Sequence, residues 1–277
     1  MSYCNLQADC EKCFGLCCVA LYFSATEGFP VNKDAGRPCI NLQDDYRCSV
    51  HKNLNKKGLK GCIVYDCLGA GQKVAQATYG GRDWKQNPES AKQMFDVFII
   101  MKQLYEMLWY LKEAFLLQSE NEAKDKLTIK IGEIEKLTDL NADSFEKLDL
   151  VPVRMGVNPL LLQTSEFVRK RARNNQRNDL KGKKTFGGGL DFIGKDLRKK
   201  DLRGANLSGA YLIAANLTGV DLSFTDLIGA DLRDADLSGA NLSKSIYLTQ
   251  AQINTAKGDI NTKLPKSIVR PMSWNNN

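Results

Sequence analysis

Residues 201–242 read DLRGANLSGAYLIAANLTGVDLSFTDLIGADLRDADLSGANL, in which leucine returns at every fifth position. A small residue usually stands two positions before the leucine, Asp or Asn usually directly before it, and glycine often two positions after it. Neither the 3.6-residue period of a helix nor the two-residue period of a strand brings leucines five apart onto one face. A chain that turns a corner every five residues does so, with the large and the small residue inward and glycine relieving the bend. The series has eleven members: Phe192, Leu197, Leu202, Leu207, Leu212, Leu217, Leu222, Leu227, Leu232, Leu237 and Leu242.

This A-(D/N)-L-x-x unit resembles the pentapeptide-repeat family over about residues 190–243. The resemblance implies a right-handed quadrilateral β-solenoid with four pentapeptides per coil. A solenoid needs covered ends, because open coils expose unpaired backbone edges and apolar interior. Thr249-Gln-Ala-Gln252 is a capping-box pattern, and it predicts a short helix over about residues 250–257 that caps the last coil.

Upstream of the repeats, apolar residues at spacings of three and four predict an all-α helical bundle. A long amphipathic helix begins at Pro88, a residue suited to a first helical turn, and runs to about Leu117. Further helical patterns cover about residues 122–137, a short stretch after Asn141, and about residues 153–173.

The sequence therefore predicts a multi-domain α + β protein with five parts. They are a Cys-rich module (1–86), a helical bundle (87–173), a basic, Gly-rich linker (174–189), a pentapeptide-repeat β-solenoid (190–248), and a capping helix with a tail (249–277).

All nine cysteines and the single histidine, His51, lie in the first 67 residues. One histidine excludes a three-His zinc site and an HExxH metalloprotease, and a Ser-His-Asp triad would need His51 inside the cysteine cluster. The N-terminus shows no secretory signal and no apolar run reaches the ~20 residues of a membrane span, so we expect a cytoplasmic protein without a membrane partner. In that compartment clustered cysteines are more often metal ligands or redox thiols than structural disulfides.

The cysteine spacings favour metal ligation. Short pairs such as Cys10-x2-Cys13 hold two thiolates within reach of one ion, and a tetrahedral zinc or iron site borrows its other ligands from a distant pair. The segment can furnish two four-thiolate sites, or seven thiolates with His51, while Cys4 is expected not to be a ligand. The predicted ligands are Cys10, Cys13, Cys17, Cys18, Cys39, Cys48, His51, Cys62 and Cys67.

This segment also resembles the zinc- or iron-chelating cysteine-cluster family, through CxxCxxxCC at Cys10–Cys18, then Pro38-Cys39, Cys48-Ser-Val-His51 and Cys62 to Cys67. The resemblance implies bound zinc or iron, at one site or two, and no settled reaction. An iron–sulfur cluster suits four thiolates equally well. Redox thiols or disulfides, and reduced thiols that merely fill a core, are the alternatives.

Positive charge gathers between Arg169 and Arg203, where thirteen Lys and Arg face four Asp. Such a run could dock on nucleic acid, although a solvated linker kept open by like charges is the favoured interpretation. The candidate nucleic-acid contacts are Arg169, Lys170, Arg171, Arg173, Arg177, Lys181, Lys183 and Lys184.

We expect a non-enzymatic, metal-binding pentapeptide-repeat protein of bacterial type, whose repeats serve protein interaction or oligomerisation. Apolar residues at outward repeat positions motivate the interaction surface: Ile213, Phe224 and Ile228. An iron or iron–sulfur redox protein or enzyme, and a nucleic-acid-associated protein, are the alternatives. Gyrase protection by DNA mimicry is disfavoured, because under three coils at ~4.8 Å spacing imitate only about four base pairs and the adjoining run is basic.

Overall fold

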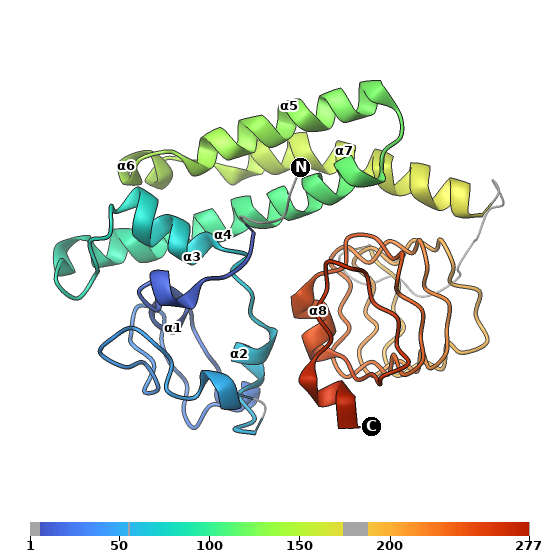
Figure 1. Ribbon diagram of the computed structural model, residues 1–277, viewed down its shortest axis with the longest axis horizontal. Helices are drawn as coiled ribbons and strands as arrows, with labels where there is room; N and C mark the ends of the chain where they lie inside the picture. Colours follow the sequence, from blue (N-terminus) through green and yellow to red (C-terminus); the bar gives the residue numbers. More distant parts are fainter. Residues whose placement is uncertain (1–5, 55, 174–187, 277) are drawn as a thin grey trace. The chain divides into compact units, whose positions relative to one another are not determined.

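The computed structural model describes residues 6–54, 56–173 and 188–276, and the chain divides into two compact units, 1–161 and 162–277 (Figure 1). The division falls inside helix α7 (Leu150–Ala172). The five-part division expected from composition stays a prediction. None of the described helices is both long enough and apolar enough to cross a membrane.

The larger helices of unit 1 (1–161) pack on α4 (Pro88–Leu117), which begins with proline at its first turn. The helices α5 (Asn121–Thr138) and α6 (Ala142–Glu146) lie against α4. Met94, Phe98 and Met101 are fully buried along α4. Burying a side chain of this size contributes about 1.5–3 kcal/mol, so this face fixes the helical part of unit 1.

Residues 6–54 and 56–87 of unit 1 form short helices joined by irregular segments. None of these helices is longer than six residues. In chain order they are η1 (Cys10–Lys12), α1 (Leu16–Ala20), η2 (Ala25–Glu27), η3 (His51–Asn53), α2 (Lys60–Val64), α3 (Ala70–Gln72) and the π-helical η4 (Lys73–Thr78). A small core of Phe23, Phe29 and Leu59 lies among them, with the two phenyl rings stacked 4.6 Å apart between centroids. The Trp84 indole donates to the carbonyl of Phe14 at 2.9 Å, which ties the segment before α4 to the cysteine loop.

The repeats in unit 2 (162–277) wind into stacked turns, here called the repeat coil (190–248), but the predicted β-solenoid is wrong. The described residues contain no β-strand and no sheet, and the protein is largely helical outside this coil, so the predicted α + β class is wrong as well. Neighbouring turns are joined by isolated parallel bridges between residues 20 apart, such as Asp191 with Tyr211 and Asn216 with Asp236. No strand forms because the chain turns directly after each bridge. A pentapeptide therefore contributes a single bridged residue, whereas a strand needs consecutive bridged residues.

The interior of the repeat coil explains the five-residue pattern. Leucines such as Leu212 and Leu222 and alanines such as Ala215 are fully buried. The Asp or Asn before the leucine accepts a hydrogen bond from the backbone N–H two residues later, as Asn216 Oδ1 does from Thr218 at 3.1 Å. These residues favour turns because their side chains bond the backbone in this way. The pattern therefore encodes a buried layer and a corner in every repeat.

The C-terminal end of the repeat coil is covered. Helix α8 (Gln250–Thr255) begins with the predicted capping box between Thr249 and Gln252. The Gln252 amide also donates to the carbonyls of Leu227 at 2.8 Å and Ala230 at 2.9 Å. After α8 the tail continues the bridge pattern at Lys257 and Lys263. The tail then ends in η5 (Met272–Asn276), where the Trp274 side chain is 2% exposed.

The end of α7 that belongs to unit 2 joins the repeat coil through a buried polar contact. The Ser165 hydroxyl donates to Asp226 Oδ2 at 2.5 Å, and Arg169 Nε donates to the Ser165 hydroxyl at 3.1 Å. Burial raises the pKa of the Asp226 carboxyl, although the Ser165 hydroxyl, the Ile228 N–H and the charge of Arg169 act in the other direction. Asp226, a residue of the repeats, thus joins the repeat coil to the end of α7 within unit 2.

Candidate metal centre

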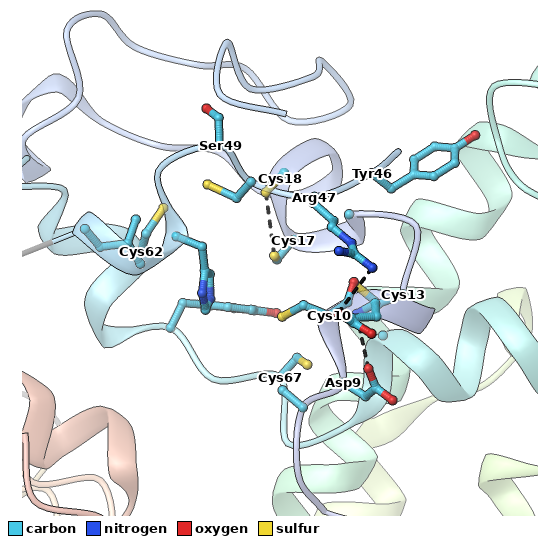
Figure 2. A pocket seen from close by; sticks show the side chains of 18 of the residues that line it. Asp9, Cys10, Cys13, Cys17, Cys18, Tyr46, Arg47, Ser49, Cys62 and Cys67 are labelled. Atoms are coloured by element: carbon cyan, nitrogen blue, oxygen red, sulfur yellow. Dashed lines mark hydrogen bonds and ion pairs between the residues drawn. The ribbon is translucent and has the colours of Figure 1, made fainter. Parts of the chain in front are cut away.

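Seven of the eight cysteines at positions 10–67 line one cavity of about 560 Å³ in unit 1, here called the cysteine cavity. They come from four separate segments of the chain: Cys10, Cys13, Cys17, Cys18, Cys48, Cys62 and Cys67. Figure 2 shows the labelled side chains of Cys10, Cys13, Cys17, Cys18, Cys62 and Cys67 arranged around this space. Chain segments more than 40 residues apart therefore present their thiols to a common volume.

The first four cysteines are placed by η1 and α1. The Asp9 carboxylate caps η1 by accepting from the Glu11 N–H at 3.1 Å. Gly15 then adopts a left-handed conformation (φ 64°) directly before α1, where a side chain would meet the carbonyl of Tyr46 and Leu42. Leu16 and Val19 are fully buried, while Cys17 and Cys18 are half-buried and line the cavity.

The helices α3 and η4 hold this cysteine loop by side-chain amides. The Gln72 amide donates to the carbonyl of Gln7 at 2.7 Å and accepts from the Asp9 N–H at 3.0 Å. The Gln76 amide donates to the carbonyl of Lys12 at 3.0 Å. These bonds fix the loop that carries Cys10 and Cys13 against a segment more than 60 residues away.

The Cys17 and Cys18 thiols form a close pair, with their sulfur atoms 4.0 Å apart. The hydrogen bond from Cys17 lowers the pKa of Cys18, and the charge of Lys33 acts in the same direction. The same hydrogen bond and burial raise the pKa of Cys17. Of the two thiols, Cys18 therefore loses its proton more readily than Cys17.

Cys10 and Cys13 behave in the same way. A hydrogen bond from Cys10 lowers the pKa of Cys13, assisted by the backbone N–H groups of Gly15 and Leu16. The same bond and burial raise the pKa of Cys10. In each half of the CxxCxxxCC segment, one cysteine therefore has a lowered pKa and its partner a raised one.

The three later thiols are kept protonated by burial. It raises the pKa of Cys62 to about 12, and it raises those of Cys48 and Cys67 against the opposing effect of backbone N–H groups. A cation that enters the cavity would reverse this preference, because a positive charge favours the thiolate.

The predicted ligands fit a soft metal in kind, and most of them line one cavity, but they are not arranged as a metal site. Among the described residues, no group of three Cys, His, Asp or Glu side chains is positioned to hold one ion. The eight cysteines that the structure describes are free thiols. The sulfur separation of 4.0 Å between Cys17 and Cys18 is close to the about 3.8 Å edge of a tetrahedron built from 2.3 Å zinc–sulfur bonds.

Two predicted ligands stand apart from the other seven. Cys39 is buried, but it does not line the cysteine cavity, and its sulfur accepts from the Asn41 N–H at 3.5 Å. His51 lines the cavity but is exposed on η3. Cys4 lies outside the described residues.

Sequence reasoning missed residues that surround the thiols. Lys33 donates to the carbonyls of Val19, Asp34 and Arg37 at 2.8–3.2 Å, and burial lowers its pKa although the thiols of Cys39 and Cys18 oppose the shift. Tyr65 and Phe98 line the cavity itself. The position of Tyr65 between Cys62 and Cys67 is the one sequence signal that could have indicated it.

Four of the eight candidate nucleic-acid contacts lie among the described residues, and three of these four make side-chain contacts along α7. Arg169 bonds Ser165, Lys170 pairs with Glu166 at 3.9 Å, and the Arg171 guanidinium lies 5.3 Å from the Phe167 ring centroid. Arg173 is half-buried. The other candidates, Arg177, Lys181, Lys183 and Lys184, lie outside the described residues, so nucleic-acid binding stays a prediction.

The predicted interaction residues do not share one side of the repeat coil. Ile213, Phe224 and Ile228 are half-buried and follow the inward leucines of three different repeats within one 20-residue turn. The ring of Phe224 also lies between two cations, 5.4 Å from the guanidinium of Arg203 and 5.2 Å from the ammonium of Lys244.

The stacked five-residue turns define a pentapeptide-repeat protein, and a family model described as pentapeptide repeats matches residues 189–223 and 215–246. The chain is 57% identical over 270 residues to the uncharacterized protein YybG of Bacillus subtilis (strain 168). The aligned region covers 98% of this chain and 95% of YybG. The chain belongs to the same family of pentapeptide-repeat proteins as YybG. The match to the repeats does not extend to the cysteine-rich segment, whose resemblance to the cysteine-cluster family stays a prediction.

Proposed function

We propose that the cysteine cavity binds zinc or iron and that the protein is a non-enzymatic metal-binding pentapeptide-repeat protein. The observation that carries this proposal is the convergence of seven thiols from separate segments on one volume. Free cysteines serve well in cores, but core packing gives no reason for so many sulfur atoms to face a cavity.

Thiolates suit zinc and iron because both metals prefer soft sulfur donors. Cys13 and Cys18 lose their protons to a metal more readily than the other thiols, since the neighbouring thiols lower their pKa values. Rotation about one side-chain bond moves each sulfur, so the pairs Cys10/Cys13 and Cys17/Cys18 can close on an ion together with Cys48, Cys62 or Cys67. An iron–sulfur cluster is the alternative occupant, and four thiolates hold it equally well.

Elemental analysis and an absorption spectrum of protein purified without oxygen test this proposal. We expect zinc or iron at one or two ions per chain; a colourless zinc protein would exclude the iron–sulfur cluster. Cys17→Ser with Cys18→Ser should lower the metal content by at least half. Cys39→Ser is the matched control, because Cys39 is a buried cysteine outside the cavity, and it should retain the metal. Full metal content in the double variant would contradict the ligand assignment.

For the repeat coil we propose self-association through the side that carries Ile193, Tyr211 and Ile213. The first two side chains are 48% and 39% exposed, and the Asp191–Tyr211 bridge places them on neighbouring turns of that side. Apolar side chains that gather on a surface favour a protein partner. Sedimentation velocity should show an oligomer that Ile213→Ser weakens, whereas Ile228→Ser on another side should not. A monomer at all concentrations would exclude this role.

A further inference from the structure

Cys10 and Cys13 lie one helical turn apart, because Cys10 begins η1 and Cys13 is its C-cap residue (Figure 2). In a 3-10 helix, side chains three residues apart eclipse each other, and at a rise of about 2.0 Å per residue their Cα atoms are about 6 Å apart. Most disulfides join Cα atoms about 5.5–6 Å apart. The Cys13 sulfur also lies 3.5 Å from the Cys10 carbonyl oxygen, so it is directed back toward Cys10. The two cysteines therefore have the spacing that a disulfide requires.

The Cys17/Cys18 pair lacks this spacing, although its sulfur atoms are only 4.0 Å apart. The two residues are neighbours in α1, and consecutive Cα atoms across a trans peptide are about 3.8 Å apart. A disulfide normally needs at least about 4.4 Å between Cα atoms. Closing this pair would distort α1, so we expect Cys17 and Cys18 to stay reduced where Cys10 and Cys13 become oxidised.

The turn that carries Cys10 and Cys13 is held from outside by two glutamines. Gln72 bonds the Gln7 carbonyl and the Asp9 N–H on one side of η1, and Gln76 bonds the Lys12 carbonyl on the other. A dithiol held at bonding distance closes more favourably than the same dithiol in an unfolded chain, because less conformational freedom is lost on closure. The fold therefore favours a disulfide at this turn.

The two thiols differ in how easily a reagent can reach them. Cys10 is exposed, whereas Cys13 is 6% exposed. Both line the cysteine cavity, whose volume of about 560 Å³ lies within the about 300–1,000 Å³ typical of small-molecule sites. Acidic side chains outnumber lysine and arginine in its wall, as Asp9, Glu11 and Asp66 against Arg47 and Lys52. A small uncharged molecule can therefore meet Cys10 without the repulsion that an anion would experience.

We propose that Cys10 and Cys13 form a thiol–disulfide exchange site whose substrate is a small uncharged disulfide. The Cys10 sulfur attacks one sulfur of the substrate, the substrate S–S bond breaks, and one half leaves as a thiol with the Cys10 proton. The Cys13 sulfur then attacks the Cys10 sulfur, and the other half leaves as a second thiol with the Cys13 proton. The protein gains one disulfide and gives two electrons and two protons to the substrate. Neither step involves a metal, so this inference does not rest on the proposed metal binding.

The test uses the full-length protein, reduced and freed of metal with a chelator, in a redox buffer of hydroxyethyl disulfide and mercaptoethanol. After an acid quench and alkylation of the remaining thiols, peptide mass spectrometry should show a Cys10–Cys13 disulfide and alkylated Cys17 and Cys18. The equilibrium constant for closure should be at least about tenfold higher in the native protein than in the same protein unfolded in urea, because the fold holds the turn. An equal constant in urea would contradict the proposal.

Single variants test the order of the two steps. Cys13→Ser should accumulate a mixed disulfide between Cys10 and mercaptoethanol, whereas Cys10→Ser should form one at Cys13 at least about tenfold more slowly, because Cys13 is buried. Cys39→Ser is the matched control, since Cys39 lies outside the cavity, and it should match the wild type. Alkylated Cys10 and Cys13 in the native protein, or a preferred disulfide between other cysteines, overturns this inference. Failure to bind zinc or iron overturns the proposed function alone, because the exchange is measured without metal.

Discussion

Gly71 of α3 lies directly against Cys13, so that a Cβ atom at position 71 would come 2.9 Å from the Cys13 Cβ. Its backbone is helical and needs no special conformation. Glycine is therefore needed at position 71 because there is no room for a side chain, and the lack of one lets α3 approach the loop that carries Cys10 and Cys13.

Gly71→Ala should destabilise unit 1 by about 1–3 kcal/mol, because an extra methyl group in a packed region forces displacement. It should also lower the metal content by moving Cys13. Gly132→Ala in α5 is the matched control, since a Cβ atom at position 132 would meet no described atom within 4 Å, and it should gain up to about 1 kcal/mol of helix stability. Urea unfolding and elemental analysis of both variants check this; equal stability of Gly71→Ala and the wild type would contradict it.

Zinc binding should release protons. Burial keeps Cys48, Cys62 and Cys67 protonated at neutral pH, and metal ligation requires their thiolates. We expect about one proton for each of these thiols that becomes a ligand, and an affinity that falls as the pH falls, because protons compete with the metal. A pH-stat titration of the metal-free protein with zinc measures the release. Binding without proton release would show that these three thiols are not ligands.

Two corners of the repeat coil predict the same cost of a methyl group, measured by substitutions in opposite directions. Ala214 holds a left-handed backbone (φ 54°) where most repeats have glycine, such as Gly219 (φ 69°). A side chain in this conformation costs about 1–2 kcal/mol. Ala214→Gly should therefore raise the free energy of unfolding of unit 2 by about 0.5 kcal/mol, after the greater chain entropy of glycine is taken into account. Gly219→Ala should lower it by about 1 kcal/mol, and urea unfolding measures both changes. Changes of the same sign in both variants would refute this account of the corners.

The buried Asp226 carboxyl predicts a pH-dependent stability of unit 2. Because its pKa is raised in the folded state, its contribution is fully present below the unfolded pKa near 4 and is lost as the pH rises through the folded pKa. Asp226→Asn should therefore gain stability relative to the wild type as the pH rises from 4 to 7. Unfolding midpoints across this range measure the trend.

Asp196 supplies the control for that experiment. The hydrogen bond from Arg198 lowers the pKa of this exposed carboxyl to about 2, so its contribution is present above the unfolded pKa and is lost as the pH falls toward 2. Asp196→Asn should show no gain between pH 4 and 7. A flat difference for Asp226→Asn over the same range would contradict the role of burial.

Local periodicity predicted the helices well, because a stripe such as Met94, Phe98 and Met101 is sufficient to place α4. The same is true of the capping box at Thr249 and Gln252. The β-structure of the repeats was predicted wrongly, because a period of five fixes where the chain bends but not how many residues pair between the bends. At most one residue in each described repeat forms a β-bridge here.

The sequence could predict that cysteines form the candidate site, but it could not predict which of them line the cavity. Spacing indicates that Cys10 and Cys13 lie together, yet the path of the chain from Cys18 to Cys48 is irregular and decides that Cys39 lies outside the cavity. Tyr65 was missed because a single tyrosine carries no periodic signal. Ile213, Phe224 and Ile228 were grouped because all three are apolar. Which side of the repeat coil each one lies on depends instead on its position within the 20-residue turn.

That 20-residue turn sets the unit in which the repeat coil can change length. An insertion of one pentapeptide would shift every later side chain to the next side of the coil relative to the turns before it. An insertion of four pentapeptides would return every later side chain to its own side, one layer further on. Viable length variants of this protein should therefore differ by multiples of twenty residues within the coil.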